Sequence, residues 1–353
     1  MANFLQSFLD AGKLSLAEKQ TIVAASKLVG RCFNNSLRAW FPVAPIGYPT
    51  NDYRALNVVG KNVTRWGNPY RLQGVSLLST IWEDSVATVN LLAEDNLNIN
   101  VVRVPIHLSD GAGNGWLQTS DKEAYWKTKI KPTVDTIIAK GWHCIVDYHR
   151  LGSWDDDTTL NDMLDFWAFM APKYADEPLV IFEMFNEPTE PMSYEVTKAA
   201  WTQYRDAMQV VVNCIRSGAP NNLIIIGSPW WSTQIKYAIE VPFAGSNLLY
   251  TYHIYPNRGG MDPLGLEHYM NIDIPSELPV ILSEFGYSIG NPVMDTDLTK
   301  NPDYPDHIKA YFKNRPHTNF TAWSYGASEE SLSMLSPQGA SMKNWLYHII
   351  PKI

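Results

Sequence analysis

Two glutamates, each placed where a hydrophobic strand pattern ends, are the residues of this sequence that could do chemistry together. Glu187 follows an apolar run in the stretch FEMFNEP, where Asn186 and Pro188 flank it. Glu284 occupies the same kind of place in PVILSEFGY. If one carboxyl group is protonated and the other is ionised, the first can assist the departure of a leaving group while the second attacks or activates water. The alternative interpretation is two unrelated glutamates that each form a salt bridge.

Eight short strands must position these residues. From about Tyr70 onward, β-branched segments alternate with longer amphipathic ones, which is typical of repeated βα units and a parallel sheet. We expect strands of ordinary length over 71–77, 100–106, 143–149, 179–185, 223–228, 248–254, 280–285 and 320–324. Helices are expected over 85–95, 122–140, 160–174 and 194–217. The prediction is an α/β fold, a closed (β/α)8 TIM barrel, in which active sites lie at the C-terminal ends of the strands.

The segment before the first barrel strand predicts two further features. Residues 56–59 and 61–66 have the pattern of a hairpin that could close the floor of the barrel. An apolar helical pattern over 16–29 predicts a helix packed on the outside of the barrel. No internal repeat or low-complexity linker appears, so residues 1–353 are interpreted as a single catalytic domain, with an N-terminal extension over 1–55 and the barrel over 56–353.

The composition argues against several classes of partner. The chain has 353 residues, 45% of them hydrophobic, and a net charge of -8, which disfavours a nucleic acid or an anionic membrane and favours a neutral ligand. The three cysteines lack the spacing of a zinc site or a disulfide framework, and we expect them to be packing residues. No apolar run approaches the roughly 20 residues that span a bilayer.

Polar and aromatic side chains collect at the C-terminal ends of the expected strands. A single histidine at such a position is more often a structural group than a catalytic one, but many such residues together favour a site. The residues concerned are Arg103, His149, Asn186, Glu187, Trp230, Trp231, His253, Tyr255, Glu284 and Trp323. Two carboxylates that face each other across a cleft floored by aromatic rings are the equipment of an enzyme that hydrolyses glycosidic bonds.

Six segments of the chain resemble glycoside hydrolase family 5, which belongs to a larger clan of (β/α)8 retaining glycosidases. NEP at 186–188 and SEFG at 283–286 are the strongest of them, and VVRVPI, VDYHR, YHIYP and AWSYG occur in the family's order. The resemblance implies Glu187 as the general acid/base and Glu284 as the nucleophile. It also implies supporting residues: Asn186 on the sugar 2-hydroxyl, Arg103 and Tyr255 on the nucleophile, His149 and His253 as polar groups, and Trp323 as the platform beneath the sugar.

The chemistry implied for the two glutamates requires them to be in opposite protonation states. Arg103, which is always protonated, would favour the ionised form of Glu284 and fix its direction. An ionised Glu284, together with partial desolvation, should raise the pKa of Glu187 above the reference value of about 4.3. In a retaining enzyme the two carboxyl groups should lie roughly 5 to 5.5 Å apart, which is less than the gap that leaves room for a water molecule.

The NEP segment predicts an irregular strand end. In a regular strand Asn186 and Glu187 would point to opposite sides, so a bulge or sharp bend is needed for both to face one cleft. Pro188 favours such an end because it cannot continue the hydrogen-bond ladder. Glu183, deeper in the barrel, is expected to have a structural hydrogen-bonded role.

Further aromatic residues could flank the cleft. Trp154, Trp230 and Trp231 are candidates for additional sugar-binding positions, because aromatic faces stack on pyranose rings, although ordinary packing accounts for each of them equally well. The weaker candidates are Trp82, Trp116 and, behind the residues that touch the substrate, His107.

These observations predict a retaining endo-β-1,4-glucanase that acts on cellulose-like or mixed-linkage β-glucan without a metal or cofactor. A β-mannanase or another β-glycanase of the family is the enzymatic alternative, because residues 256–275 depart from the pattern of common cellulases. An inactive carbohydrate-binding barrel would have lost an essential polar residue, and each of the implied ones is present. A phosphate-handling barrel would carry glycine-rich loops where EFGYS and WSYGA stand.

The expected substrate also bears on location and assembly. Polymeric glucans cannot enter a cell intact, so we expect an extracellular or cell-surface enzyme that acts on a polysaccharide or oligosaccharide. No signal segment is visible at the start of this chain, and an intracellular enzyme for short oligosaccharides is the alternative. A monomer is the default expectation.

Overall fold

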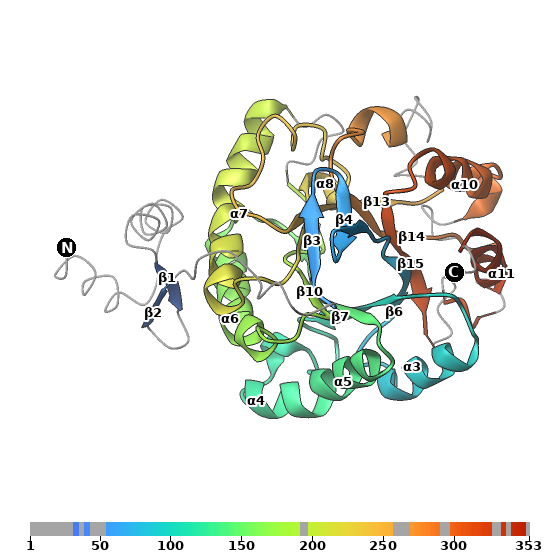
Figure 1. Ribbon diagram of the computed structural model, residues 1–353. Helices are drawn as coiled ribbons and strands as arrows, with labels where there is room; N and C mark the ends of the chain where they lie inside the picture. Colours follow the sequence, from blue (N-terminus) through green and yellow to red (C-terminus); the bar gives the residue numbers. More distant parts are fainter. Residues whose placement is uncertain are drawn as a thin grey trace.

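The barrel predicted from the sequence is present. The computed structural model describes residues 31–34, 39–42, 54–190, 197–256, 269–289, 297–326, 333–336 and 340–350. Within them, eight parallel strands close on themselves (Figure 1). Their order is β6 (Gln73–Leu77), β7 (Val101–His107), β8 (His143–His149), β10 (Val180–Glu183), β12 (Ile224–Ile226), β13 (Leu248–Ile254), β14 (Val280–Phe285) and β15 (Asn319–Tyr325), which pairs again with β6. The predicted (β/α)8 class is therefore confirmed.

Helices surround the barrel in Figure 1. Their bounds are α3 (Ser85–Glu94), α4 (Lys122–Tyr125), α5 (Lys131–Ala139), α6 (Asp157–Lys173), α7 (Lys198–Gly218), α8 (Pro229–Ser232), α10 (Tyr304–Asn314) and α11 (Ala340–Ile349). A π-helical segment, Trp126–Ile130, joins α4 to α5, so one helical stretch fills most of the range 122–140. Short helical segments also occur in loops, at Trp116–Gln118, Tyr269–Asp273 and Leu298–Lys300.

Side-chain caps fix the starts of α3, α6 and α7. Asp84, Asp156 and Thr197 each accept a hydrogen bond from the backbone N–H three residues later. Such caps satisfy N–H groups that the first turn of a helix leaves without an intrahelical partner. Because each of these helices follows a loop that leaves the C-terminal end of a strand, the caps also determine where those loops end.

An apolar hairpin seals one end of the barrel. It consists of β3 (Leu56–Val59) and β4 (Asn62–Arg65), extended by β5 (Asn68–Pro69), and it lies across the barrel opening in Figure 1. Leu56 and Val63 from this hairpin pack against apolar residues near the starts of the barrel strands. The floor hairpin expected from the sequence is therefore present, and polar groups are left to gather at the opposite end.

The residues before the floor hairpin contribute one further pair of strands. β1 (Arg31–Asn34) and β2 (Ala39–Pro42) pair antiparallel and lie beside α7. The helix predicted over 16–29 falls outside the described residues, and the division into extension and barrel stays a prediction. Cys144 and Cys214 are buried free thiols, as expected of packing residues. Among the described helices, none combines the length and apolar character needed to cross a membrane.

Candidate active site

Glu284 lies near the C-terminal end of β14 with a hydrogen-bond donor on each oxygen. Arg103, from β7, donates from Nη1 to Oε1 at 2.8 Å, and the hydroxyl of Tyr255, just past β13, donates to Oε2 at 3.0 Å. Only 7% of the Glu284 side chain is exposed. The carboxylate is therefore held in one direction by donors from two other parts of the barrel.

Glu187 follows a break in its strand. β10 ends at Glu183, and the chain resumes pairing only at β11 (Glu187–Pro188), which pairs with β9 (Leu151–Gly152) in a separate two-stranded sheet. Asn186 N–H donates to the carbonyl of Tyr148 at 3.1 Å across this break. The bend expected at NEP is present, and it turns Asn186 and Glu187 toward the same side.

The two glutamates and a histidine meet at the centre of this end of the barrel. One oxygen of Glu187, one oxygen of Glu284 and one ring nitrogen of His253 lie within 4.8 Å of one another. Nδ1 of His253 is 2.8 Å from Oε1 of Glu187 and 3.7 Å from Oε2 of Glu284. The structure thus brings together, from the fourth and seventh barrel strands, the two carboxyl groups that the sequence singles out.

Arg103 is the centre of a buried charge cluster beneath the pair. Besides its bond to Glu284, it donates from Nε to Oε2 of Glu183 at 2.5 Å and from Nη2 to Oδ1 of Asn186 at 2.6 Å. Nη2 also lies 2.9 Å from Oδ2 of Asp147. A buried cation requires such pairing, because an unpaired charge in the interior is costly. Glu183 has the structural hydrogen-bonded role that the sequence predicts.

Burial dominates the protonation of this cluster. It raises the pKa of Glu284 to about 7, although Arg103 acts in the opposite direction. Burial likewise raises the pKa of Asp147 to about 7, and it raises the pKa of Glu183. Burial alone would lower the pKa of Arg103, but the three carboxylates raise it above its ordinary value. Arg103 therefore favours ionised Glu284 as expected, but desolvation of the carboxyl group is the larger effect.

A stacked pair of rings lies next to the cluster. The rings of His149 and Trp323 are stacked and nearly parallel, with an angle of 2° between their planes and 5.4 Å between their centroids. Nδ1 of His149 pairs with Oδ2 of Asp147 at 2.7 Å, and burial lowers the pKa of His149 well below its ordinary value, so the ring is neutral. Trp323 also packs against Leu78 and Tyr255, which places it beside the partner of Glu284.

Trp154 is buried, with 7% of the residue exposed. It belongs to the core between the barrel and the helices, where its ring contacts Tyr204 of α7 with centroids 5.4 Å apart. Its indole N–H donates to the carbonyl of Glu190 at 2.7 Å. These contacts favour the packing alternative for Trp154 over a sugar-binding role. Trp116 is buried in the same core.

Trp230 and Trp231 remain candidates for sugar contacts. Both are partly exposed in α8, the short turn after β12, and α8 lies beside β11, which carries Glu187. Their backbones take left-handed φ values of 51° and 53°, an uncommon conformation for large residues. Ser232 helps to hold this turn, because its hydroxyl donates to the carbonyl of Asn186 at 2.5 Å.

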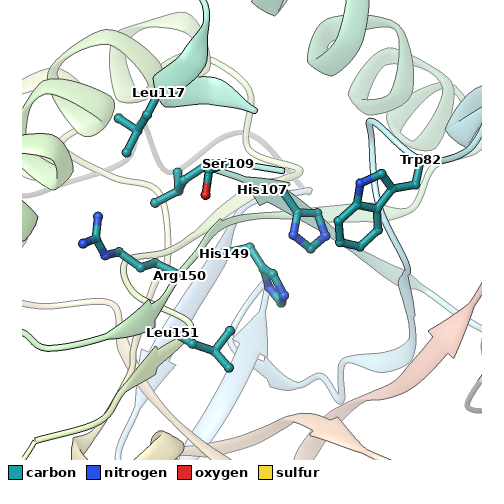
Figure 2. Close-up of a pocket in the computed structure, with 8 residues that line it drawn as sticks. Trp82, His107, Ser109, Leu117, His149, Arg150 and Leu151 are labelled. Atoms are coloured by element: carbon teal, nitrogen blue, oxygen red, sulfur yellow. The ribbon is translucent and has the colours of Figure 1, made fainter. Parts of the chain in front are cut away.

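A pocket of about 480 Å³ adjoins His149 (Figure 2). Figure 2 shows the rings of Trp82 and His107 side by side in its wall, and their centroids are 4.3 Å apart. The lining residues come from β7, β8 and the loops after β6, β7 and β8: Trp82, His107, Leu108, Ser109, Leu117, His149, Arg150 and Leu151. Most of these residues could not be predicted from the sequence, because loop residues carry no periodic signal.

A (β/α)8 barrel whose fourth and seventh strands lead into two close glutamates, with an arginine and a tyrosine on one of them, has the fold and site of a glycoside hydrolase. Residues 63–329 match the family model described as Cellulase (glycosyl hydrolase family 5). The chain belongs to this family, in agreement with the motifs around 186–188 and 283–286.

Several curated proteins and solved structures are similar to the chain. An endoglucanase of Clostridium saccharobutylicum is 25% identical over 309 residues, which cover 84% of this chain and 64% of the relative. Endoglucanase A of Butyrivibrio fibrisolvens is 26% identical over 289 residues, or 80% of this chain and 63% of the relative. The chain thus spans a little under two thirds of the length of these two relatives.

Solved structures share the fold. The structure of cellulase Cel5C_n is 26% identical, with a TM-score of 0.65 over 87% of this chain and 92% of that chain. The catalytic domain of a Thermobifida fusca endoglucanase, in complex with cellotetraose, is 22% identical, with a TM-score of 0.66 over 85% of this chain and 99% of that chain.

Proposed function

We propose that the chain is a retaining endo-β-1,4-glucanase that hydrolyses cellulose-like or mixed-linkage β-glucan by double displacement. The observation that carries the retaining mechanism is the closeness of Glu187 and Glu284, an oxygen of each lying within 4.8 Å of the other. Carboxyl groups of retaining enzymes are about 5 to 5.5 Å apart, whereas inverting enzymes leave about 6.5 to 9.5 Å for a water molecule.

In the first half-reaction, Glu284 attacks the anomeric carbon while Glu187 gives its proton to the oxygen of the leaving sugar. Arg103 and Tyr255 hold the attacking carboxylate in place. The bond from Arg103 to Oδ1 of Asn186 orients that amide so that its NH2 group can donate to the sugar 2-hydroxyl. The products are a free sugar end and a glycosyl ester on Glu284.

In the second half-reaction, Glu187 takes a proton from water, whose oxygen attacks the anomeric carbon and releases Glu284. Because Glu284 is neutral while it is an ester, it no longer repels the negative charge of ionised Glu187. The two inversions together retain the configuration of the sugar. The acid and the base are the same residue, used in turn.

The glucan substrate is inferred from the relatives and from the positions for sugars around the site. The named relatives are endoglucanases, and one solved neighbour holds cellotetraose, a glucose oligomer. Trp323 packs beside Tyr255, Trp230 and Trp231 lie near β11, and the pocket beside His149 lies toward β7 and β8. Such an extended surface suits a polymer, which supports action outside the cell or on its surface.

The test is hydrolysis of carboxymethyl cellulose, mixed-linkage β-glucan, mannan and xylan by the wild type and by Glu187→Gln and Glu284→Gln. We expect the wild type to release reducing ends from the glucans and both variants to lose about 10³-fold or more in kcat. Glu240→Gln is the matched control, because Glu240 is exposed and pairs only with surface Lys198 among the described contacts.

The possible outcomes test the proposed mechanism and the proposed substrate separately. Proton NMR of the first product should show the β-anomer, since retention preserves the configuration of the cleaved bond. Preference for mannan would keep the mechanism and replace the glucan assignment. Activity that survives in both glutamate variants would overturn the assignment of the site.

A further inference from the structure

A line of hydrogen bonds runs from Glu187 down to the buried charge cluster. Nδ1 of His253 is 2.8 Å from Oε1 of Glu187, and Nε2 of His253 is 3.0 Å from Oγ of Ser283. Ser283 donates to Oε1 of Glu183 at 2.6 Å, and the other oxygen of Glu183 accepts from Arg103. His253, Ser283, Glu183 and Arg103 are all buried, so protein groups rather than bulk water set the proton positions along this line.

The hydroxyl of Ser283 has one proton to give, and where that proton goes decides the tautomer of His253. Burial raises the pKa of Glu183, but Arg103 acts in the opposite direction and favours the ionised carboxylate through a charge-assisted bond. An ionised carboxylate only accepts, so Glu183 in this form takes the proton of Ser283. Thr251, the third neighbour of Ser283, can donate its own hydroxyl proton. Nε2 of His253 therefore meets an oxygen with no proton left to offer, and it must carry a proton itself.

We propose that Glu183 and Ser283 are positioning residues that fix His253 as the Nε2–H tautomer, so that its Nδ1 faces Glu187 as an acceptor and keeps the general acid protonated. The short contact between Nδ1 and Oε1 requires a proton, and Glu187 supplies it in the resting enzyme. Burial lowers the pKa of His253, which agrees with a neutral ring that carries a single proton.

The same arrangement serves both half-reactions of the proposed mechanism, on which this inference rests. Once Glu187 has given its proton to the leaving sugar, its carboxylate faces the lone pair of Nδ1. Two acceptors at hydrogen-bond distance repel each other, and this repulsion is removed when Glu187 takes a proton from the incoming water. The fixed tautomer thus favours a protonated acid in the first step and a strong base in the second.

Several charged or titratable groups face His253. The effect of the hydrogen-bond line through Ser283 must be distinguished from their electrostatic effect on the ring. These groups are Glu187, Glu284, Glu183, Arg103 and His149. Arg103 lowers the pKa of His253, while Glu284 and Glu183 raise it. The hydroxyl of Ser283 carries no charge, so replacing it changes the hydrogen-bond line and leaves the charges in place.

The direct test is the 15N NMR spectrum of the histidine rings in the whole chain at neutral pH. The chain has eight histidines, and the signals of His253 are assigned by their absence in His253→Gln. We expect a protonated Nε2 and an unprotonated Nδ1. A proton on Nδ1 overturns the proposal. This readout needs no catalysis, so it is independent of any failure of the glucanase assignment.

The second test is the pH profile of kcat/KM in Ser283→Ala. Without Oγ, His253 can place its proton on Nδ1 and donate it to ionised Glu187, which lowers the pKa of Glu187. The general acid must be protonated, so the alkaline limb should move to lower pH by about one unit or more. Glu183→Gln should shift it in the same direction, because an amide N–H can donate to Ser283 and turn its proton toward His253.

Asp147→Asn is the matched control for the loss of a buried carboxylate. Asp147 contacts Arg103 and His149 and lies outside the line through Ser283. We expect its alkaline limb to move less than that of Glu183→Gln. Equal shifts in the two variants would attribute the effect to general electrostatics and overturn the proposal. An unshifted profile in Ser283→Ala would also overturn it. Where Glu183→Gln does not fold, Ser283→Ala and the NMR spectrum decide.

Discussion

At the scale of single residues, the protonation state of each carboxyl group depends on the hydrogen-bond partners that remain once the group is buried. Glu284 is less exposed than Glu187, at 7% against 12% of the side chain, yet it is the one whose reaction requires the ionised form. Arg103 and Tyr255 make ionisation possible by donating to its two oxygens. The proposed nucleophile therefore depends on protein donors, rather than on solvent, for its charge.

The pH dependence of the reaction should show this balance. The proposed mechanism requires ionised Glu284, so activity should fall as the pH drops through the pKa of this group, which burial raises from 4.5 to about 7. Tyr255→Phe removes one donor to the ionised form, and the acidic limb of kcat/KM should move to higher pH by about one unit. The measurement is a pH–rate profile on a soluble glucan. An acidic limb that stays in place in Tyr255→Phe would contradict the role given to this contact.

The proximity of the proposed catalytic pair could be predicted from the sequence because the signal for it is local. Glu187 and Glu284 each follow an apolar run of strand length, and in a parallel barrel all such ends meet at one face. Asp147 could have been predicted by the same logic, since it lies two residues before His149 on the same face of β8. The tautomer of His253 could not, because it depends on which side chains other strands bring to it.

At the scale of elements, the site depends on places where regular structure stops. The break after β10 turns Glu187 into the cleft, and the left-handed turn of α8 lies against β11 on the same side. Neither follows from periodicity alone. Trp154 shows the limit most clearly: it follows β9 closely in sequence, but its ring turns outward to Tyr204 on α7. The path of a loop is set by tertiary contacts, and those decide whether an aromatic residue faces substrate or core.

Two tryptophan variants test that distinction. Trp154→Ala should lower the free energy of unfolding by about 3 to 5 kcal/mol, because it empties a large volume in the core. Trp230→Ala should leave stability nearly unchanged and lower kcat/KM on long glucans by about tenfold, through the loss of a stacking surface. Denaturant unfolding and rates on long and short glucans give the two readouts. Reversed effects would exchange the roles assigned to the two residues.

At the scale of the whole molecule, the barrel separates the groups that hold it together from those that react. Apolar side chains fill the end closed by β3 and β4, and the charge cluster around Arg103 occupies the other end. Burial of apolar area stabilises the fold, whereas the paired charges cost desolvation and serve the chemistry. Changes at the floor should therefore alter stability without altering the reaction.

Leu56→Ala provides the test of that separation. Leu56 is 2% exposed, and its truncation should lower the free energy of unfolding by about 2 to 5 kcal/mol. Under conditions where the variant remains folded, kcat should match the wild type. Val59→Ala, at a position of the same hairpin that is 60% exposed, is the control and should change neither quantity. A fall in kcat of folded Leu56→Ala would show that the two ends of the barrel are coupled.

The sealed floor also restricts how a polymer can meet this enzyme. Leu56 and Val63 pack across the far opening, so a substrate has access to the end of the barrel that carries Glu187 and Glu284. We therefore expect the proposed glucan substrate to lie across the rim that carries Glu187 and Glu284 and to be cut within its length, as the proposed endo action requires. If the enzyme acts in this way, each cut yields two shorter chains, and the viscosity of a glucan solution should drop well before small sugars accumulate.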